Sequence, residues 1–223
     1  CSQLIVELLE VLLDNNEIRK EFQLLRGVKT LCNTLATMSS ENMRNPTVLL
    51  SLVRCMGKLA IEKATTREIR YHNGISILLL LLEEPERNTN QSDNTNNKDS
   101  IALIELKTSV CAALTQISLD DDSSILIRKS DGVYKLGHLI LVYFSLDYTS
   151  LSEEIIESQL YALRSLRFLY SMERNRKIFK KLFPPDIFAL FIDIGHYVRN
   201  IDAYRPLLTA FYDLQWKDKA SII

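Results

Sequence analysis

The chain has 223 residues, of which 47% are hydrophobic and 25% are charged, and its formal net charge is -1. This composition excludes an intrinsically disordered chain, and the near-zero net charge excludes a globally basic nucleic-acid binder. Only 6 glycines and 5 prolines occur, which is too few turn residues for a β-sandwich or barrel, so we expect an all-α fold.

A three-helix unit is predicted to recur along the chain. In each copy an apolar helix precedes a short basic helix, and a glycine followed by an apolar residue then opens a third helix. The glycine pairs are Gly27-Val28, Gly74-Ile75 and Gly132-Val133. The first two glycines lie 74 − 27 = 47 residues apart and the next two lie 58 apart, or 46 without the Asn-rich segment 87–98. Spacings in the mid-forties are typical of HEAT and armadillo repeats.

Apolar stripes at helical spacing predict the first helix of each unit. The four stripes are Leu8-Leu9-Leu12-Leu13, Leu52-Met56-Leu59, Val110-Ala113-Leu114-Ile117 and Leu163-Leu166-Leu169-Tyr170. An apolar residue also stands five places before each glycine, namely Phe22, Ile69 and Ile127, and in a fourth copy Ile178 stands five places before Phe183. We expect each glycine to adopt a positive φ where the short helix meets the third one, because glycine does so without a Cβ clash.

Each third helix is predicted to have an apolar face of its own. The sets are Val28, Leu31, Leu35 and Met38; Ile75, Leu78, Leu79 and Leu82; Val133, Leu136, Leu139, Ile140 and Tyr143; and Ile187, Leu190, Phe191, Ile194 and Val198. The second of these helices is apolar on almost every side, which predicts an interior position in a stack of repeats.

These patterns predict an all-α, armadillo-like right-handed superhelix, an α-solenoid of about four repeats. The expected repeats are 1–42, 43–98, 99–148 and 149–199, with a mobile Asn-rich loop at 87–98. Residues 200–223 are expected to form a C-terminal helical cap or the start of a further repeat.

The sequence offers no catalytic, cofactor-binding or metal-binding constellation. No phosphate-binding glycine motif and no HExxH or GxSxG motif occurs, so the chain is not expected to be an enzyme. The four cysteines are Cys1, Cys32, Cys55 and Cys111, and none forms a CxxC pair. We expect buried reduced thiols in a cytoplasmic protein, with a disulfide framework or a zinc site as the alternatives. The longest apolar run, residues 75–82, is too short to cross a membrane.

The densest charge feature lies between Arg164 and Lys181, where seven basic residues stand against one acid, Glu173. They are Arg164, Arg167, Arg174, Arg176, Lys177, Lys180 and Lys181. We favour a solvated helical face as the interpretation of these residues. A surface that binds an acidic or phosphorylated segment of a protein partner is the next alternative, and a nucleic-acid interface is the least favoured. The oligomeric state and the partner's identity stay open.

The stretch between Tyr161 and Tyr204 closely resembles the end of the armadillo region of a NIMA-related kinase. The specific segments are Ser171-Met172-Glu173-Arg174-Asn175-Arg176, Leu182-Phe183-Pro184 and Phe191-Ile192-Asp193-Ile194-Gly195-His196-Tyr197-Val198-Arg199. The close similarity covers about a fifth of the chain, and it fades after Tyr204.

The resemblance implies a serine/threonine kinase that uses ATP and Mg²⁺, linked to cell-cycle signalling and cilia. The β3 lysine, HRD and DFG motifs of such a kinase are missing here, so ATP and Mg²⁺ belong only to the parent's kinase domain. The expected function is a non-catalytic interaction and regulatory module that binds a protein partner or the kinase domain itself. A stand-alone armadillo scaffold or a nucleic-acid-binding helical repeat are the alternatives. Nuclear and ciliary locations are further implications of the resemblance.

Overall fold

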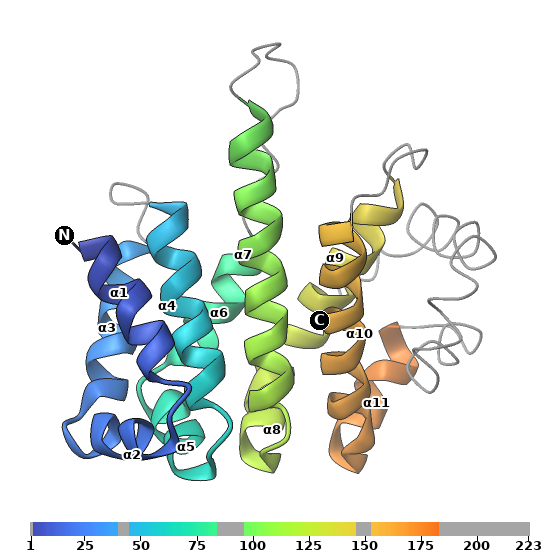
Figure 1. Cartoon of the computed structure of the whole chain (residues 1–223). Coiled ribbons are helices and arrows are strands. Elements are labelled where there is room, and N and C mark those ends of the chain that lie inside the picture. Colours follow the sequence, from blue (N-terminus) through green and yellow to red (C-terminus); the bar gives the residue numbers. More distant parts are fainter. Residues whose placement is uncertain (1, 40–44, 84–95, 146–152, 183–223) are drawn as a thin grey trace.

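A computed structural model describes residues 2–39, 45–83, 96–145 and 153–182, and within these ranges the chain is helical and has no strand (Figure 1). The helices are α1 (Ser2–Leu12), α2 (Asn16–Leu24), α3 (Gly27–Met38), α4 (Pro46–Leu59), α5 (Lys63–Tyr71), α6 (Gly74–Leu82), α7 (Asn96–Ile117), α8 (Asp121–Lys129), α9 (Gly132–Ser145), α10 (Glu153–Ser171) and α11 (Glu173–Leu182). The expected all-α class is therefore confirmed.

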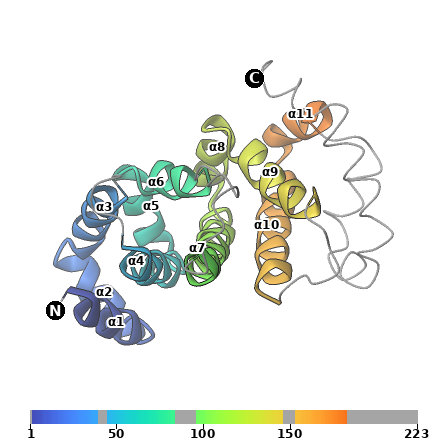
Figure 2. The same cartoon turned by 90° about the horizontal axis from the view of Figure 1, so that it is seen from above.

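The helices form two rows joined by short helices at one end of the molecule. α1, α4, α7 and α10 lie side by side, and each packs against the next (Figure 1). Seen from above, α3, α6 and α9 form a second row, and neighbouring members of this row are in contact (Figure 2). Each of the short helices α2, α5, α8 and α11 follows a first-row helix, and α2, α5 and α8 lead to the second row near the lower end of the stack in Figure 1. This stacked, all-helical arrangement is consistent with an α-solenoid.

The predicted apolar stripes mostly form the core between the rows. In α4, α7 and α10 the stripes are buried, apart from Tyr170, which is partly exposed. Leu8 and Leu12 of α1 differ, with 58% and 41% of their surfaces exposed. α6 contacts α3, α5, α7, α8 and α9, so its predicted interior position is confirmed, although Leu80 is 52% exposed.

The other third-helix faces agree with the prediction as far as the structure describes them. In α3 and α9 the following residues are buried: Val28, Leu31, Leu35, Val133, Leu136 and Leu139. The side chains of Ile140 and Tyr143, and the whole set after residue 182, lie outside the described part of the chain.

The predicted positive φ of the joint glycines is wrong. None of the described glycines has a positive φ; the residue before each joint does, with φ of 58° at Arg26, 61° at Asn73 and 58° at Asp131. These three residues form the left-handed connection between the short helix and the third helix. The glycine then begins the third helix with ordinary backbone angles.

Close packing explains the glycines instead. A Cβ on Gly27 would lie 2.6 Å from the Phe22 ring, and one on Gly74 would lie 2.7 Å from Ile69 Cγ2. Gly132 would clash in the same way with Ile127. The side chain five places earlier therefore occupies the space that a Cβ would need, which accounts for the recurring pair of an apolar residue and a glycine.

The fourth copy has a register one residue later than the sequence pattern suggested. Phe179 is completely buried and its ring lies 5.4 Å from the Tyr170 ring, whereas Ile178 is only partly buried. Phe179, not Ile178, thus takes the place of Ile69 and Ile127. The position five residues after Phe179 is Pro184, which lies outside the described residues.

The repeat boundaries stay a prediction. α7 begins at Asn96, so the last three residues of the segment 87–98, expected to be a loop, are helical. Residues 84–95 and the expected cap at 200–223 lie outside the described part of the chain.

Candidate partner-binding surface

The predicted basic residues lie on α10 and α11 at the end of the first row. Six of the seven have described side chains, and all six are exposed: Arg164, Arg167, Arg174, Arg176, Lys177 and Lys181. The side chain of Lys180 lies outside the described ones. On α11, Arg174, Lys177 and Lys181 are three and four residues apart, so they share one face of the helix.

Arg176 has a structural role that the sequence reasoning missed. Its Nε donates to the carbonyl of Tyr170 at 3.3 Å and its Nη2 donates to that of Ser171 at 3.1 Å. Its guanidinium also lies 5.7 Å from the centre of the Tyr170 ring. Arg176 therefore caps the C-terminus of α10, and its role in binding a partner stays a prediction.

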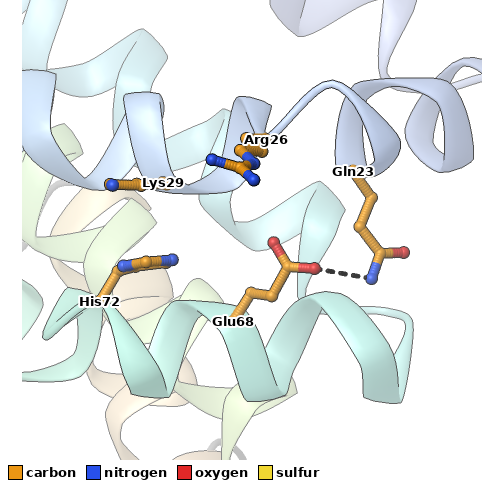
Figure 3. Close-up of a pocket in the computed structure, with 5 residues that line it drawn as sticks. All are labelled: Gln23, Arg26, Lys29, Glu68 and His72. Atoms are coloured by element: carbon orange, nitrogen blue, oxygen red, sulfur yellow. Dashed lines mark hydrogen bonds between the residues drawn. The ribbon is translucent and has the colours of Figure 1, made fainter.

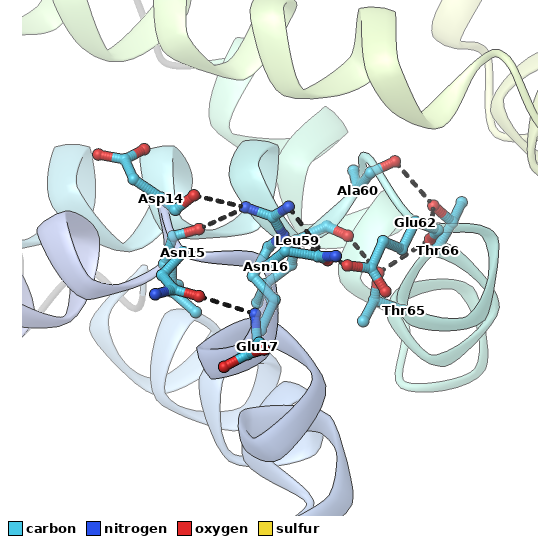
Figure 4. A network of polar contacts seen from close by, with 11 residues as sticks. Asp14, Asn15, Asn16, Glu17, Leu59, Ala60, Glu62, Thr65 and Thr66 are labelled. Carbon is cyan, nitrogen blue, oxygen red and sulfur yellow. Dashed lines mark hydrogen bonds and ion pairs between the residues drawn. The ribbon is translucent and has the colours of Figure 1, made fainter.

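The first repeat unit contains the same cap. Arg19 Nη1 donates to the carbonyls of Leu13 and Asp14 at 2.9 and 3.1 Å. Figure 4 shows this network at the end of α1, with the Asp14 carbonyl among its acceptors and Glu62, the residue before α5, beside it. Arg19 is eight residues before Gly27, and Arg176 is eight before Pro184, so the two caps occupy equivalent positions.

Arg176→Ala is expected to lower the free energy of unfolding by about 1 kcal/mol, since it leaves two helix-terminal carbonyls without their donor. Lys177→Ala, on the neighbouring exposed position, should change it by less than about 0.5 kcal/mol. Urea unfolding of the two variants checks this. Equal stabilities would contradict the capping role.

Ion pairs connect neighbouring short helices. Arg19 Nε lies 3.4 Å from Glu62 Oε1 between α2 and α5. Between α5 and α8, Arg70 pairs with Asp120 and, at 3.2 Å, with Asp122. Burial tends to raise the pKa of Asp120, but hydrogen bonds from Ser123 and the Arg70 charge lower this pKa below its usual value.

The junction between α8 and α11 lacks such an ion pair among the described residues. Asn175 Nδ2 donates to Ser124 Oγ at 3.0 Å across it. Arg128 stands four residues before Gly132, as Arg70 does before Gly74, but its Nε is buried without a hydrogen-bond partner. Arg174 is ten residues before Pro184, just as Asp122 is ten residues before Gly132. An arginine thus replaces the carboxylate, so this end of the stack has unneutralised positive charge.

A second candidate site is a cleft of about 280 Å³ between α2, α3 and α5, which the sequence reasoning did not find. Figure 3 shows Arg26 and Lys29 facing Glu68 and His72 across it, with Gln23 at one side. Gln23 Nε2 donates to Glu68 Oε1 at 2.8 Å across one side of the cleft. No local sequence motif joins these residues, because the cleft forms only when two units stack.

The three cysteines that the structure describes are buried and form no metal-binding cluster with other described residues. Cys32, Cys55 and Cys111 are buried free thiols, as predicted, and burial raises the pKa of each to about 12. They stay protonated at neutral pH and are poor nucleophiles. Cys1 lies outside the described residues, among which there is no cluster of His, Cys, Asp and Glu side chains suited to a metal ion.

Within the described ranges, none of the helices combines the length and the apolar character needed to cross a lipid bilayer.

Comparison with known proteins links the chain to kinases. It is 46% identical over 106 residues to the mouse serine/threonine-protein kinase Nek10, covering 48% of this chain and 9% of the relative. The human serine/threonine-protein kinase Nek10 is 46% identical over 104 residues, or 47% of this chain and 8% of the relative. The Caenorhabditis elegans serine/threonine-protein kinase D1044.8 is 26% identical over 215 residues, which is 96% of this chain and 20% of that protein.

The chain therefore spans between 8% and 20% of the length of these relatives. No family model matches the chain. The similarities support a link to the NIMA-related kinases.

Proposed function

We propose that this chain is a non-catalytic, armadillo-like interaction and regulatory module of a NIMA-related serine/threonine kinase. The main support is that about half of this chain is 46% identical to a stretch of the mouse and human kinases Nek10, and that this stretch makes up under a tenth of each kinase. Because the β3 lysine, HRD and DFG motifs are absent from this sequence, we propose that ATP and Mg²⁺ bind to a separate kinase domain of the parent protein. The stacked helices provide the rigid surface that such a module needs.

The basic end of the stack is the proposed binding surface. Arg174, Lys177 and Lys181 are exposed on one face of α11, and Arg128 adds a cation at the junction with α8. Their charges lack ion-pair partners among the described residues, so an acidic or phosphorylated segment can neutralise them without displacing an internal contact. We propose that this segment belongs to a protein partner or to the kinase domain of the parent protein.

The test is binding of the chain to the kinase domain from the same parent protein, with and without phosphorylation, measured by isothermal titration calorimetry at two salt concentrations. The triple variant Arg174→Glu, Lys177→Glu, Lys181→Glu should weaken binding at least about tenfold, since like charges now face the acidic segment. Arg176 is left intact because it caps α10.

A matched control reverses three exposed basic residues elsewhere, Lys20, Lys63 and Arg67, with the same change in net charge. It should bind as the natural chain does. Equal weakening by both triple variants would show that binding depends on net charge and not on the α11 surface. No binding under any condition would contradict the kinase-domain proposal. Salt-sensitive binding to an oligonucleotide instead would favour the nucleic-acid alternative.

A further inference from the structure

One face of α1 has large apolar side chains that the rest of the described chain does not cover. Ile5, Leu8 and Leu12 are 65%, 58% and 41% exposed. They are three and four residues apart, so they form a continuous stripe on one side of the helix. Leu4 beside them is 72% exposed. A stripe of this kind marks an interaction surface.

Equivalent positions in the other first-row helices are buried. Relative to Gly27, the three residues are at 27 − 5 = 22, 27 − 8 = 19 and 27 − 12 = 15 places before the joint. The same places before Gly74, Gly132 and Pro184 hold Leu52, Cys55 and Leu59; Val110, Ala113 and Ile117; and Ala162, Ser165 and Leu169. All nine of these residues are at most 2% exposed. Only α1 leaves this stripe open among the described helices.

The middle position of the stripe faces the preceding first-row helix at every junction that the structure describes. Cys55 Sγ of α4 lies 4.0 Å from the carbonyl oxygen of Val6 in α1. Ala113 of α7 lies against Gly57 of α4, where an added Cβ would be 3.6 Å from the alanine Cα. Ser165 Oγ of α10 donates to the carbonyl of Cys111 in α7 at 3.1 Å. Leu8 therefore faces the place where a helix before α1 would lie.

We infer that the Ile5–Leu8–Leu12 stripe is the binding site for one more first-row helix, supplied by the segment that precedes this chain in the longer protein. The inference is independent of the proposed function. It follows from continuity with three stacking contacts of the same register, and the relatives, which are more than four times as long as this chain, have the length for such a segment. Leu8 is larger than Cys55, Ala113 or Ser165, so the added helix should present a small residue to it, as α4 presents Gly57 to α7.

The experiment compares this chain with a version extended at its N-terminus by the natural preceding residues, at least one repeat of about 47 residues. Hydrogen exchange of the α1 amides should be at least about tenfold slower in the extended protein, since stacking protects a terminal helix. In the extended protein Leu8→Asp should lower Tm by roughly 5 °C or more, because it buries an unpaired carboxylate at the contact.

Val11 provides a matched control on the same helix. It is 66% exposed, against 58% for Leu8, but it lies 16 residues before Gly27, a position held by Lys58, Gln116 and Phe168 in α4, α7 and α10. These three side chains keep part of their surface in solvent in the stack, so Val11→Asp should lower Tm of the extended protein clearly less than Leu8→Asp does.

Equal effects of Leu8→Asp and Val11→Asp in the extended protein would overturn the inference, as would unchanged exchange of the α1 amides. Dimerisation of the extended protein that Leu8→Asp abolishes, as seen by sedimentation, would assign the stripe to a second copy of the chain instead and would also overturn it. Binding to the kinase domain is measured separately, so failure here leaves the proposed function untouched.

Discussion

Phe179→Ala should lower the free energy of unfolding by about 3–5 kcal/mol, whereas Ile178→Ala should cost clearly less, at most about 2 kcal/mol. Phe179 is completely buried, and its ring meets the Tyr170 ring edge-on at 5.4 Å, so its removal leaves a cavity between α10 and α11. Ile178 next to it keeps part of its surface in solvent, and truncating it opens less space.

This comparison tests the register of the fourth copy, because only one of the two neighbours can pack in the place of Ile69 and Ile127. Urea unfolding of both variants, with circular dichroism to confirm retained helix content, measures the difference. If Ile178→Ala were the more destabilising change, the joint would lie at Phe183, as the sequence pattern first suggested.

The sequence alone predicted the order of helices and most of the core, because both follow from apolar spacing. The stripes of α4, α7 and α10 and the interior position of α6 are local patterns that survive in the folded chain. The register of the fourth copy was missed because Ile178 and Phe179 are both apolar, and the glycine that marks the joint elsewhere is absent there.

The candidate site was less predictable, because it depends on contacts between units. Composition identified the basic segment, but it could not separate Arg176, which caps α10, from Arg174 and Lys177, which face solvent. The cleft lined by Arg26 and Glu68 joins residues from two units, and no pattern within one unit indicates it.

The structural reason for the repeated glycines was also not predictable from the sequence. Their spacing revealed the repeat, yet the reason for them is a contact with the side chain five places earlier and not a positive φ. A conformational explanation and a packing explanation predict the same residue at the same position. Only the packing explanation predicts that the energetic cost of a Cβ depends on what it would meet.

Gly74→Ala and Gly57→Ala should therefore change stability in opposite directions. A Cβ on Gly74 would lie 2.7 Å from Ile69 Cγ2 and 3.0 Å from both the Ile69 carbonyl oxygen and Met56 Cε, so we expect a loss of about 1–3 kcal/mol from overpacking. A Cβ on Gly57, inside α4, would meet Ala113 at an ordinary 3.6 Å, and the higher helix propensity of alanine should add up to about 1 kcal/mol.

The stability of Gly27→Ala is expected to lie between those of the other two variants. The three atoms nearest to a Cβ on Gly27 would all belong to the Phe22 ring, which is partly exposed and can rotate away. The carbonyl beside Gly74 belongs to the backbone of α5 and cannot. The expected order of stability is Gly57→Ala, then Gly27→Ala, then Gly74→Ala, measured as midpoints of thermal unfolding. Equal midpoints for the Gly57 and Gly74 variants would show that the repeated glycine is not retained for the packing of the residue five places before it.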